Sequence, residues 1–241
     1  RPEITGSGSK YLNHVQPVKY EMKPDTPKSN ADKSKMPNRL HALSNFKTFT
    51  AAVAGLMIAA ATALIYSNTL QSPFTFDDLP NISENSHIRL QNISANRVFN
   101  LLKNSGNRPI PALSFALNYY LNGYDPFGYH VVNMLIHAIT GMLFFLFIKS
   151  TTDLYATRNQ EKEPFFSLPT TLIAILSALL WVVHPVNTQS VTYIVQRMNS
   201  LSTMFCMLCF VLYIKGRSSS GRGKSLAFLA AIIAWLLALG S

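Results

Sequence analysis

The sequence predicts an all-α polytopic membrane protein, and three observations support this fold class. Of the 241 residues, 48% are hydrophobic and only 13% are charged, whereas a typical soluble domain has about 25% charged residues. Several apolar runs lack Asp, Glu, Lys and Arg and approach the roughly 17–25 residues that a membrane-spanning helix needs. Basic residues gather in alternate connections, as in membrane proteins. We expect five spans, near residues 48–67, 127–148, 168–186, 198–214 and 225–241.

The charge distribution predicts how these spans are oriented. The net charge is +10, and residues 1–47 hold nine Lys and Arg against four Asp and Glu. Residues 215–224 hold four basic residues and no acidic one, whereas loops 149–163 and 68–126 are balanced. Because basic residues are enriched in cytoplasmic segments, we expect the long loop 68–126 on the extracytoplasmic face. The tail and the other two loops are expected in the cytoplasm. The positive charge therefore indicates topology and does not indicate nucleic-acid binding.

Two domains are expected. Residues 1–47 are rich in Lys, Pro, Ser and Asn without a sustained apolar period, which predicts a disordered basic cytoplasmic tail. Residues 48–241 then form the transmembrane module.

The long first loop is predicted to contain one short amphipathic helix. Ser94 would cap its N-terminus, and the helix would end near Asn104. Its apolar face would consist of three residues, Val98, Phe99 and Leu102. Such a helix would either lie along the membrane surface or pack against the spans, and the sequence leaves both open.

Polar residues within the spans have two readings. His130, Asn133 and His137 form a stripe at i, i+3 and i+7, which favours hydrogen bonding between helices. A metal site would need a further ligand, so we expect no metal ligands, whereas a transport pathway lined by this stripe remains an alternative. Cys206 and Cys209 share a helix face inside an apolar run, where cysteine acts as a small hydrophobic residue.

Two adjacent carboxylates, Asp77 and Asp78, follow the first span. Carboxylates at the edge of a bilayer are costly unless they have a function, although the same residues also suit an ordinary turn. The predicted topology places further polar residues on their face of the membrane: Arg108, His184, Gln189 and Arg197. A carboxylate can act as a general base toward a hydroxyl, and an arginine can bind a phosphate and stabilise its charge. These residue types favour transfer of a group from a lipid phosphate, with snorkelling as the alternative for each arginine.

Five motifs follow one another in order: Phe76–Ile82 (FDDLPNI), Asn107–Ile110 (NRPI), Asp125–Asn133 (DPFGYHVVN), His184–Gln189 (HPVNTQ) and Tyr193–Arg197 (YIVQR). Together they resemble the membrane portion of the TMTC-type protein O-mannosyltransferases, in which tetratricopeptide (TPR) repeats follow the membrane region. The resemblance implies a GT-C glycosyltransferase fold, a polyprenyl-phosphate sugar donor and inversion at the sugar carbon. It places the protein in a bacterial inner membrane or the endoplasmic reticulum membrane, with a protein Ser or Thr as acceptor.

The resemblance also implies roles for individual residues. Asp77 and Asp78 would form the catalytic acidic motif, with Asp77 favoured as the base. Arg108 and Arg197 would bind the donor phosphate. Three further residues would line the site: His184, Gln189 and His130. No cofactor beyond the donor is assigned, and a divalent-metal requirement stays open.

Two departures from the family pattern matter. Gln189 stands where the family usually has Glu, which motivates the alternative of a non-catalytic protein that binds the lipid-linked sugar or assists assembly. The family's membrane core has about seven helices, so five spans are expected to be an N-terminal part that is inactive alone. The expected activity of the whole protein is transfer of a sugar, with mannose favoured.

Two Asn-x-Ser triplets in the long loop match the N-glycosylation pattern, Asn81-Ile82-Ser83 and Asn92-Ile93-Ser94. They have a consequence only if the loop enters a eukaryotic secretory compartment.

Overall fold

The computed structural model describes the backbone of residues 36–158 and 168–241, and side chains from residue 49 onward. Contacts divide the chain into residues 1–43 and a unit from Ser44 to Ser241, and the second unit contains the features discussed below. Every regular element in the described ranges is helical, which confirms the all-α prediction. The predicted tail lies mostly outside the described residues, and helix α1 begins at Met36.

Among the described residues, four helices are long and apolar enough to cross a membrane: α1 (Met36–Tyr66), α4 (Pro126–Arg158), α7 (Arg197–Ser218) and α8 (Gly221–Leu239). A fifth candidate span is broken. Its first part is α5 (Thr170–Val182), and its second part, which includes α6 (Thr188–Thr192), is bent from α5 by 50°. The break has a local cause, because Pro185 has no backbone N–H and disfavours helical geometry at His184. The apolar runs therefore predicted the right elements.

The helices extend beyond the predicted spans. Helix α4 continues to Arg158. An i,i+4 ion pair between Lys149 and Asp153 stabilises its C-terminal half. Helix α7 continues to Ser218, and α8 begins at Gly221, whose φ of 57° turns the chain. Charged residues end a hydrophobic run without ending a helix. Hydropathy therefore predicted the membrane spans but did not predict where the helices end.

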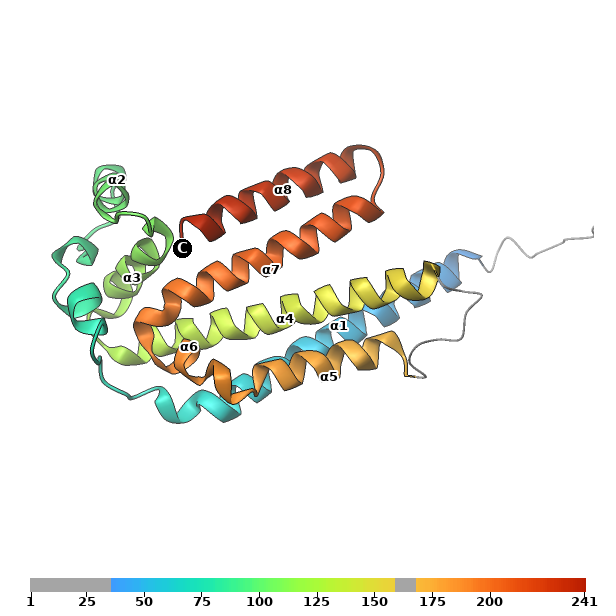
Figure 1. Ribbon diagram of the computed structural model, residues 1–241, viewed down its shortest axis with the longest axis horizontal. Coiled ribbons are helices and arrows are strands. Elements are labelled where there is room, and N and C mark those ends of the chain that lie inside the picture. Colours follow the sequence, from blue (N-terminus) through green and yellow to red (C-terminus); the bar gives the residue numbers. More distant parts are fainter. Residues whose placement is uncertain (1–35, 159–167) are drawn as a thin grey trace, which may run out of the picture. The chain divides into compact units, whose positions relative to one another are not determined.

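The spans pack through small and branched apolar side chains. One core joins α1, α4 and α5 through Ala54, Ile58, Phe145, Ala174, Ala178 and Val182 (Figure 1). Gly141 permits the closest approach, because a Cβ there would lie 2.5 Å from the Val182 Cγ2 atom. Helix α8 lies beside α7 and buries an alanine face, Ala227, Ala231, Ala234 and Ala238.

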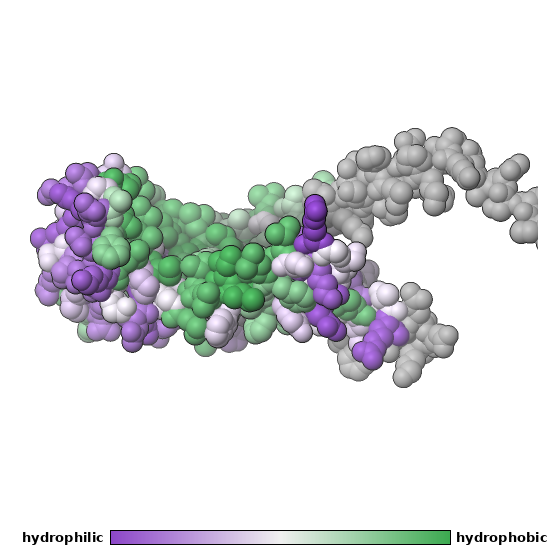
Figure 2. Space-filling model, turned by 90° about the horizontal axis from the view of Figure 1, so that it is seen from above, coloured by the Kyte–Doolittle hydropathy of each residue, from purple (hydrophilic) through white to green (hydrophobic). Residues whose placement is uncertain are grey.

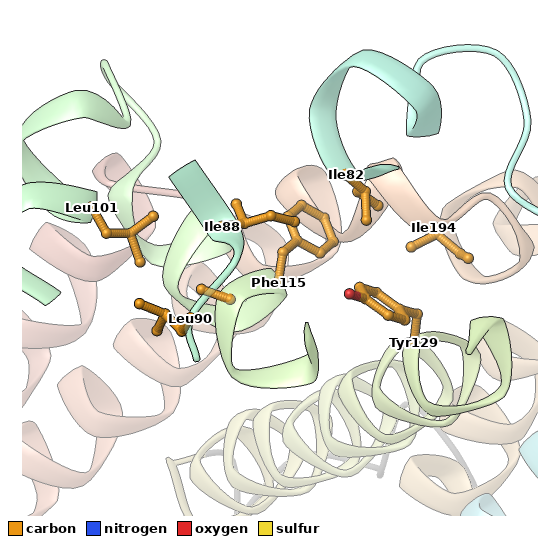
Figure 3. Close-up of a cluster of buried hydrophobic side chains, with 8 residues drawn as sticks. Ile82, Ile88, Leu90, Leu101, Phe115, Tyr129 and Ile194 are labelled. Carbon is orange, nitrogen blue, oxygen red and sulfur yellow. The ribbon is translucent and has the colours of Figure 1, made fainter. Parts of the chain in front are cut away.

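The loop after α1 folds over one end of the helices. It contains α2 (Ala95–Asn104) and α3 (Pro109–Asn122). A second core joins these helices to α4 and to the segment before α7, and includes Ile82, Ile88, Leu90, Leu101, Phe115, Tyr129 and Ile194 (Figure 3). Figure 2 shows hydrophilic residues gathered at this end and hydrophobic residues over the spans.

The predicted loop helix is present, with one correction. The Ser94 hydroxyl oxygen accepts a hydrogen bond from Arg97 N at 3.4 Å, as expected of an N-cap. However, α2 buries Leu101, which the predicted apolar face did not include, and leaves Phe99 66% exposed. The contact with α3 decides which face is buried, and α3 was not predicted.

Candidate active site

The two neighbouring aspartates have opposite environments. Asp78 is only 1% exposed. Its Oδ1 accepts a hydrogen bond from Val195 N at 2.7 Å, and its Oδ2 accepts one from Thr75 N at 3.0 Å. Burial raises the pKa of Asp78 above its ordinary value, although these two N–H donors act in the opposite direction. Asp77 is exposed. One carboxylate thus anchors the motif and the other faces outward.

The backbone of Asp77 is held on both sides. Its N–H donates to the Tyr193 hydroxyl oxygen at 2.8 Å, and its carbonyl oxygen accepts from Asn81 Nδ2 at 2.8 Å. The Asp77 carboxylate is therefore exposed, while hydrogen bonds with Tyr193 and Asn81 fix the backbone that carries it.

Phe76, directly before Asp77, has a strained backbone. Its φ is 45°, and its side chain is 84% exposed. A bulky residue at positive φ is an outlier, and such strain persists where neighbouring contacts over-determine the conformation, often at functional sites. Here the Thr75 N–H donates to the nearby Asp78 carboxylate, and the Asp77 N–H donates to the distant Tyr193 hydroxyl oxygen. The Phe76 ring and the Asp77 carboxylate are consequently both exposed at the surface.

Arg197 occupies the interior and not the surface. Its side chain is 0% exposed. It donates four hydrogen bonds, to Asn133 Oδ1 (2.7 Å), Ser114 Oγ (2.8 Å), Asn118 Oδ1 (2.6 Å) and the Tyr129 carbonyl oxygen (2.9 Å). Its guanidinium carbon also lies 4.6 Å from the Phe115 ring centroid. These acceptors and the aromatic face offset the loss of hydration. A guanidinium without exposed surface cannot contact a donor phosphate in this conformation, so the role expected of Arg197 is corrected.

Arg197 and Asp78 act on the same short segment. Val195, whose N–H binds Asp78, lies two residues before Arg197. Arg197 fixes the start of α7 to α3 and α4. The buried arginine therefore holds the segment to which the acidic motif is attached.

Arg108 is placed differently from Arg197. It is exposed at the N-terminus of α3, and its Nη1 lies 3.2 Å from the Met198 sulfur, a weak acceptor. It lines a cavity of about 540 Å³. Other lining residues are Asn81, Asn85, His87, Ile88, Leu101, Asn104, Ser105, Gly106, Asn107, Ala112, Phe115 and Met198. None of these lining residues is acidic, so an anion entering the cavity meets a cation and no like charge.

The three predicted lining residues separate. His184 and Gln189 are exposed around the break between α5 and α6. His184 Nδ1 accepts from Val186 N at 3.2 Å, and the Gln189 carbonyl oxygen accepts from Tyr193 N at 3.1 Å, which links this break to the residue beside Asp77. His130 is buried, and its Nε2 lies 3.0 Å from the Ser72 carbonyl oxygen. His130 therefore fastens the loop to α4 and does not line an open site.

The rest of the polar stripe also serves packing. Asn133 Nδ2 donates to the carbonyl oxygens of Val191 and Ile194, both at 3.3 Å. His137 Nε2 lies 3.0 Å from the Val182 carbonyl oxygen. These contacts confirm the predicted hydrogen bonding between helices.

Sequence reasoning missed two residues next to Asp77. Tyr193 and Asn81 both lie inside the quoted motifs, yet neither was assigned a role at the acidic site. Their signal was their position: Asn81 follows Asp77 by one helical turn, and Tyr193 precedes the start of α7 by four residues. Nothing in the local pattern shows that a tyrosine 116 residues away in sequence binds the Asp77 backbone.

Membrane-length apolar helices and a loop-end polar site define the class, a polytopic helical membrane protein. Protein O-mannosyl-transferase tmtc2 of Xenopus laevis is 35% identical over an alignment of 199 residues that covers 78% of this chain and 21% of that protein. Protein O-mannosyl-transferase Tmtc3 of Drosophila melanogaster is 31% identical over an alignment of 179 residues that covers 69% of this chain and 19% of that protein. This chain belongs to the TMTC-type protein O-mannosyltransferase family.

The chain spans about one fifth of the length of these relatives. No family profile matches the chain, and no solved structure matches it.

Proposed function

We propose that this chain contributes the acidic site of a membrane glycosyltransferase. The whole protein would transfer mannose from a polyprenyl-phosphate carrier to Ser or Thr hydroxyls of proteins on the extracytoplasmic face, within a GT-C-like helical fold. The observation that carries the proposal is the opposite environment of the two aspartates, because it leaves one oriented carboxylate exposed. The names of the relatives, protein O-mannosyl-transferases, support the reaction class.

Asp77 is the proposed general base. The acceptor hydroxyl oxygen would attack the anomeric carbon of the sugar while its proton passes to the Asp77 carboxylate. The bond between the anomeric carbon and the phosphate oxygen breaks, and polyprenyl phosphate leaves. A single displacement inverts the configuration at that carbon. Tyr193 and Asn81 would keep the Asp77 backbone in place during this step.

Arg108 is the proposed ligand of the donor phosphate. Its guanidinium has a thioether as its hydrogen-bond partner, so its other N–H groups remain available for a phosphate. The cavity that it lines combines amide side chains with an apolar wall that includes Ile88 and Leu101. Asn81 lines this cavity and binds the Asp77 backbone. Asn81 thus links the cavity that Arg108 lines to the backbone of Asp77.

A second candidate is a non-catalytic protein that binds the lipid-linked sugar. The exposed Gln189 favours it, because a neutral amide stands where the family usually has an acid. The transporter alternative loses its support, since His130, Asn133 and His137 are all engaged in packing.

The test uses the full-length protein in nanodiscs with a panel of polyprenyl-phosphate sugars and acceptor proteins, with and without EDTA. Hexose addition is measured by intact mass. Asp77→Asn should lower the transfer rate by roughly 10²–10⁴-fold, the usual contribution of a general base. Glu84→Gln, which neutralises another exposed acid in the same loop, is the matched control. Unchanged transfer by Asp77→Asn would overturn the base assignment. Donor binding without transfer by the wild type would favour the non-catalytic alternative.

A further inference from the structure

The long loop holds two Asn-x-Ser triplets, and the structure separates them. We propose that Asn92 carries an N-linked oligosaccharide in the folded protein and that Asn81 does not. The inference rests on the orientation of the loop in the proposed function, but it does not need the catalytic step. It assigns a modification site outside the candidate active site.

Asn92 lies in an open segment. The residues from Asn92 to Ser94 are exposed and precede the first turn of α2, and Ile93 is 57% exposed. Ser94 has extended backbone angles, with φ −126° and ψ 150°. Within the described ranges the Asn92 amide forms no hydrogen bond. An enzyme can therefore reach this amide without unfolding any element.

The Ser94 hydroxyl suits the modification as well as the helix cap. Its oxygen accepts the hydrogen bond from Arg97 N, and its own hydrogen is left to donate toward the Asn92 side chain. Capping of α2 and recognition of the triplet are thus compatible. This arrangement also makes Ser94→Thr a conservative variant, because threonine both caps helices and completes the triplet.

All three residues of the other triplet, Asn81, Ile82 and Ser83, are either hydrogen-bonded through their side chains or buried. Asn81 Nδ2 donates to the Asp77 carbonyl oxygen, and Ser83 Oγ donates to the Leu79 carbonyl oxygen at 3.2 Å. Ile82 between them is fully buried in the loop core (Figure 3). The segment Leu79–Ser83 is a single π-helical turn. A glycan on Asn81 would replace one of the two Nδ2 hydrogens, on the atom that binds the acidic motif, and would place a large group beside the cavity that Asn81 lines.

The modification is an ordinary glycosyl transfer from a lipid diphosphate oligosaccharide. The Asn92 Nδ2 atom forms a bond to the anomeric carbon, the bond from that carbon to the diphosphate breaks, and the lipid diphosphate leaves. The lost amide proton passes to a base of the host transferase. Because a large hydrophilic glycan stays in water, its presence would also place the N-terminal end of α2 outside the bilayer.

The test expresses the full-length protein in cultured animal cells and purifies the folded fraction. Deglycosylation with peptide N-glycosidase F in H₂¹⁸O converts each glycosylated Asn to labelled Asp, and peptide mass spectrometry locates the label. We expect label at Asn92 and none at Asn81. The apparent mass of Asn92→Gln should be lower than that of the wild type by one glycan. Asn81→Gln and Ser94→Thr should retain the glycan on Asn92.

Label at Asn81 in the folded fraction, or an unlabelled Asn92, would overturn the inference. An epitope inserted at Gly106, which lies in an open turn, reports the orientation independently in sealed and permeabilised microsomes. An extracytoplasmic epitope with an unmodified Asn92 overturns only the glycosylation site. A cytoplasmic epitope overturns this inference and the proposed face together. The hexose-transfer assay decides the proposed reaction separately.

Discussion

The polar cluster around Arg197 and the surface at Phe76 and Asp77 differ in how their hydrogen-bonding groups are used. Arg197 is surrounded by neutral acceptors and aromatic faces, and its bonds join three helices. At the surface, the backbone of Asp77 is fixed while its carboxylate is exposed. Buried polar groups are costly unless they are paired, whereas an oriented and exposed acid is available to a substrate. The comparison separates residues that build the site from residues that act in it.

The largest expected effect comes from the buried cluster. Arg197→Ala leaves three side-chain oxygens without their donor and should lower the free energy of unfolding by about 3 kcal/mol or more, because each buried group left unsatisfied costs about 1–3 kcal/mol. Thermal unfolding of the full-length protein in nanodiscs measures this. Arg222→Ala, at an exposed arginine in the first turn of α8, is the control and should change stability by less than about 0.5 kcal/mol. Equal stabilities of the two variants would contradict the role given to Arg197.

Arg108 is expected to affect binding and not stability. Arg108→Ala should weaken binding of a polyprenyl-phosphate sugar by roughly 10–100-fold, because hydrogen bonds to charged groups contribute about 1.5–3 kcal/mol. The melting temperature should stay near that of the wild type. Titration of the variant in nanodiscs measures the affinity, and Arg89→Ala, which removes an exposed arginine elsewhere in the loop, is the matched control. Unchanged affinity would remove Arg108 from the donor site.

The two aspartates provide an internal comparison. Asp78→Asn replaces one acceptor of a buried N–H with a donor and should destabilise the protein by about 1–3 kcal/mol. Asp77→Asn should change stability by less than about 0.5 kcal/mol while abolishing most transfer. Chemical unfolding and the transfer assay measure the two effects on the same samples. A stable Asp78→Asn protein would show that the anchor is dispensable.

The pH dependence of stability also depends on Asp78. Its pKa is raised in the folded state by burial, so the folded state holds the proton more tightly than the unfolded state. The contribution of this group is fully present below the unfolded pKa of about 3.9, and it decreases as the pH rises through the folded pKa. Asp78→Asn should make the free energy of unfolding less dependent on pH between about 3.9 and the folded pKa of Asp78. An unchanged slope would show that another group dominates this range.

The smallest expected effect is at Phe76. Glycine and asparagine tolerate a positive φ better than phenylalanine, so Phe76→Gly and Phe76→Asn should raise stability by about 0.5–1 kcal/mol. Asparagine is the better test, because glycine also increases the conformational entropy of the unfolded chain. Phe76→Ala keeps the strain and serves as the control. Equal melting temperatures for alanine and asparagine would show that the backbone is not strained in the membrane-embedded protein.

The apolar runs of the sequence determined the membrane-length helices, because hydrophobicity and length are local properties. The Ser94 cap was predictable for the same reason, and so was the hydrogen bonding of the polar stripe in α4. The helix ends were not, because hydropathy does not register helical residues beyond the apolar run, such as those up to Arg158 and Ser218.

Only the tertiary structure decided which of two adjacent aspartates is exposed and which arginine is buried. Asp78 is buried because Val195, far along the chain, supplies an N–H to it, and Arg197 is buried because Asn118 and Asn133 converge on it from α3 and α4. Neighbouring residues of one type look alike in sequence. Their roles diverge through partners more than 60 residues away, and only the packed helices bring those partners together.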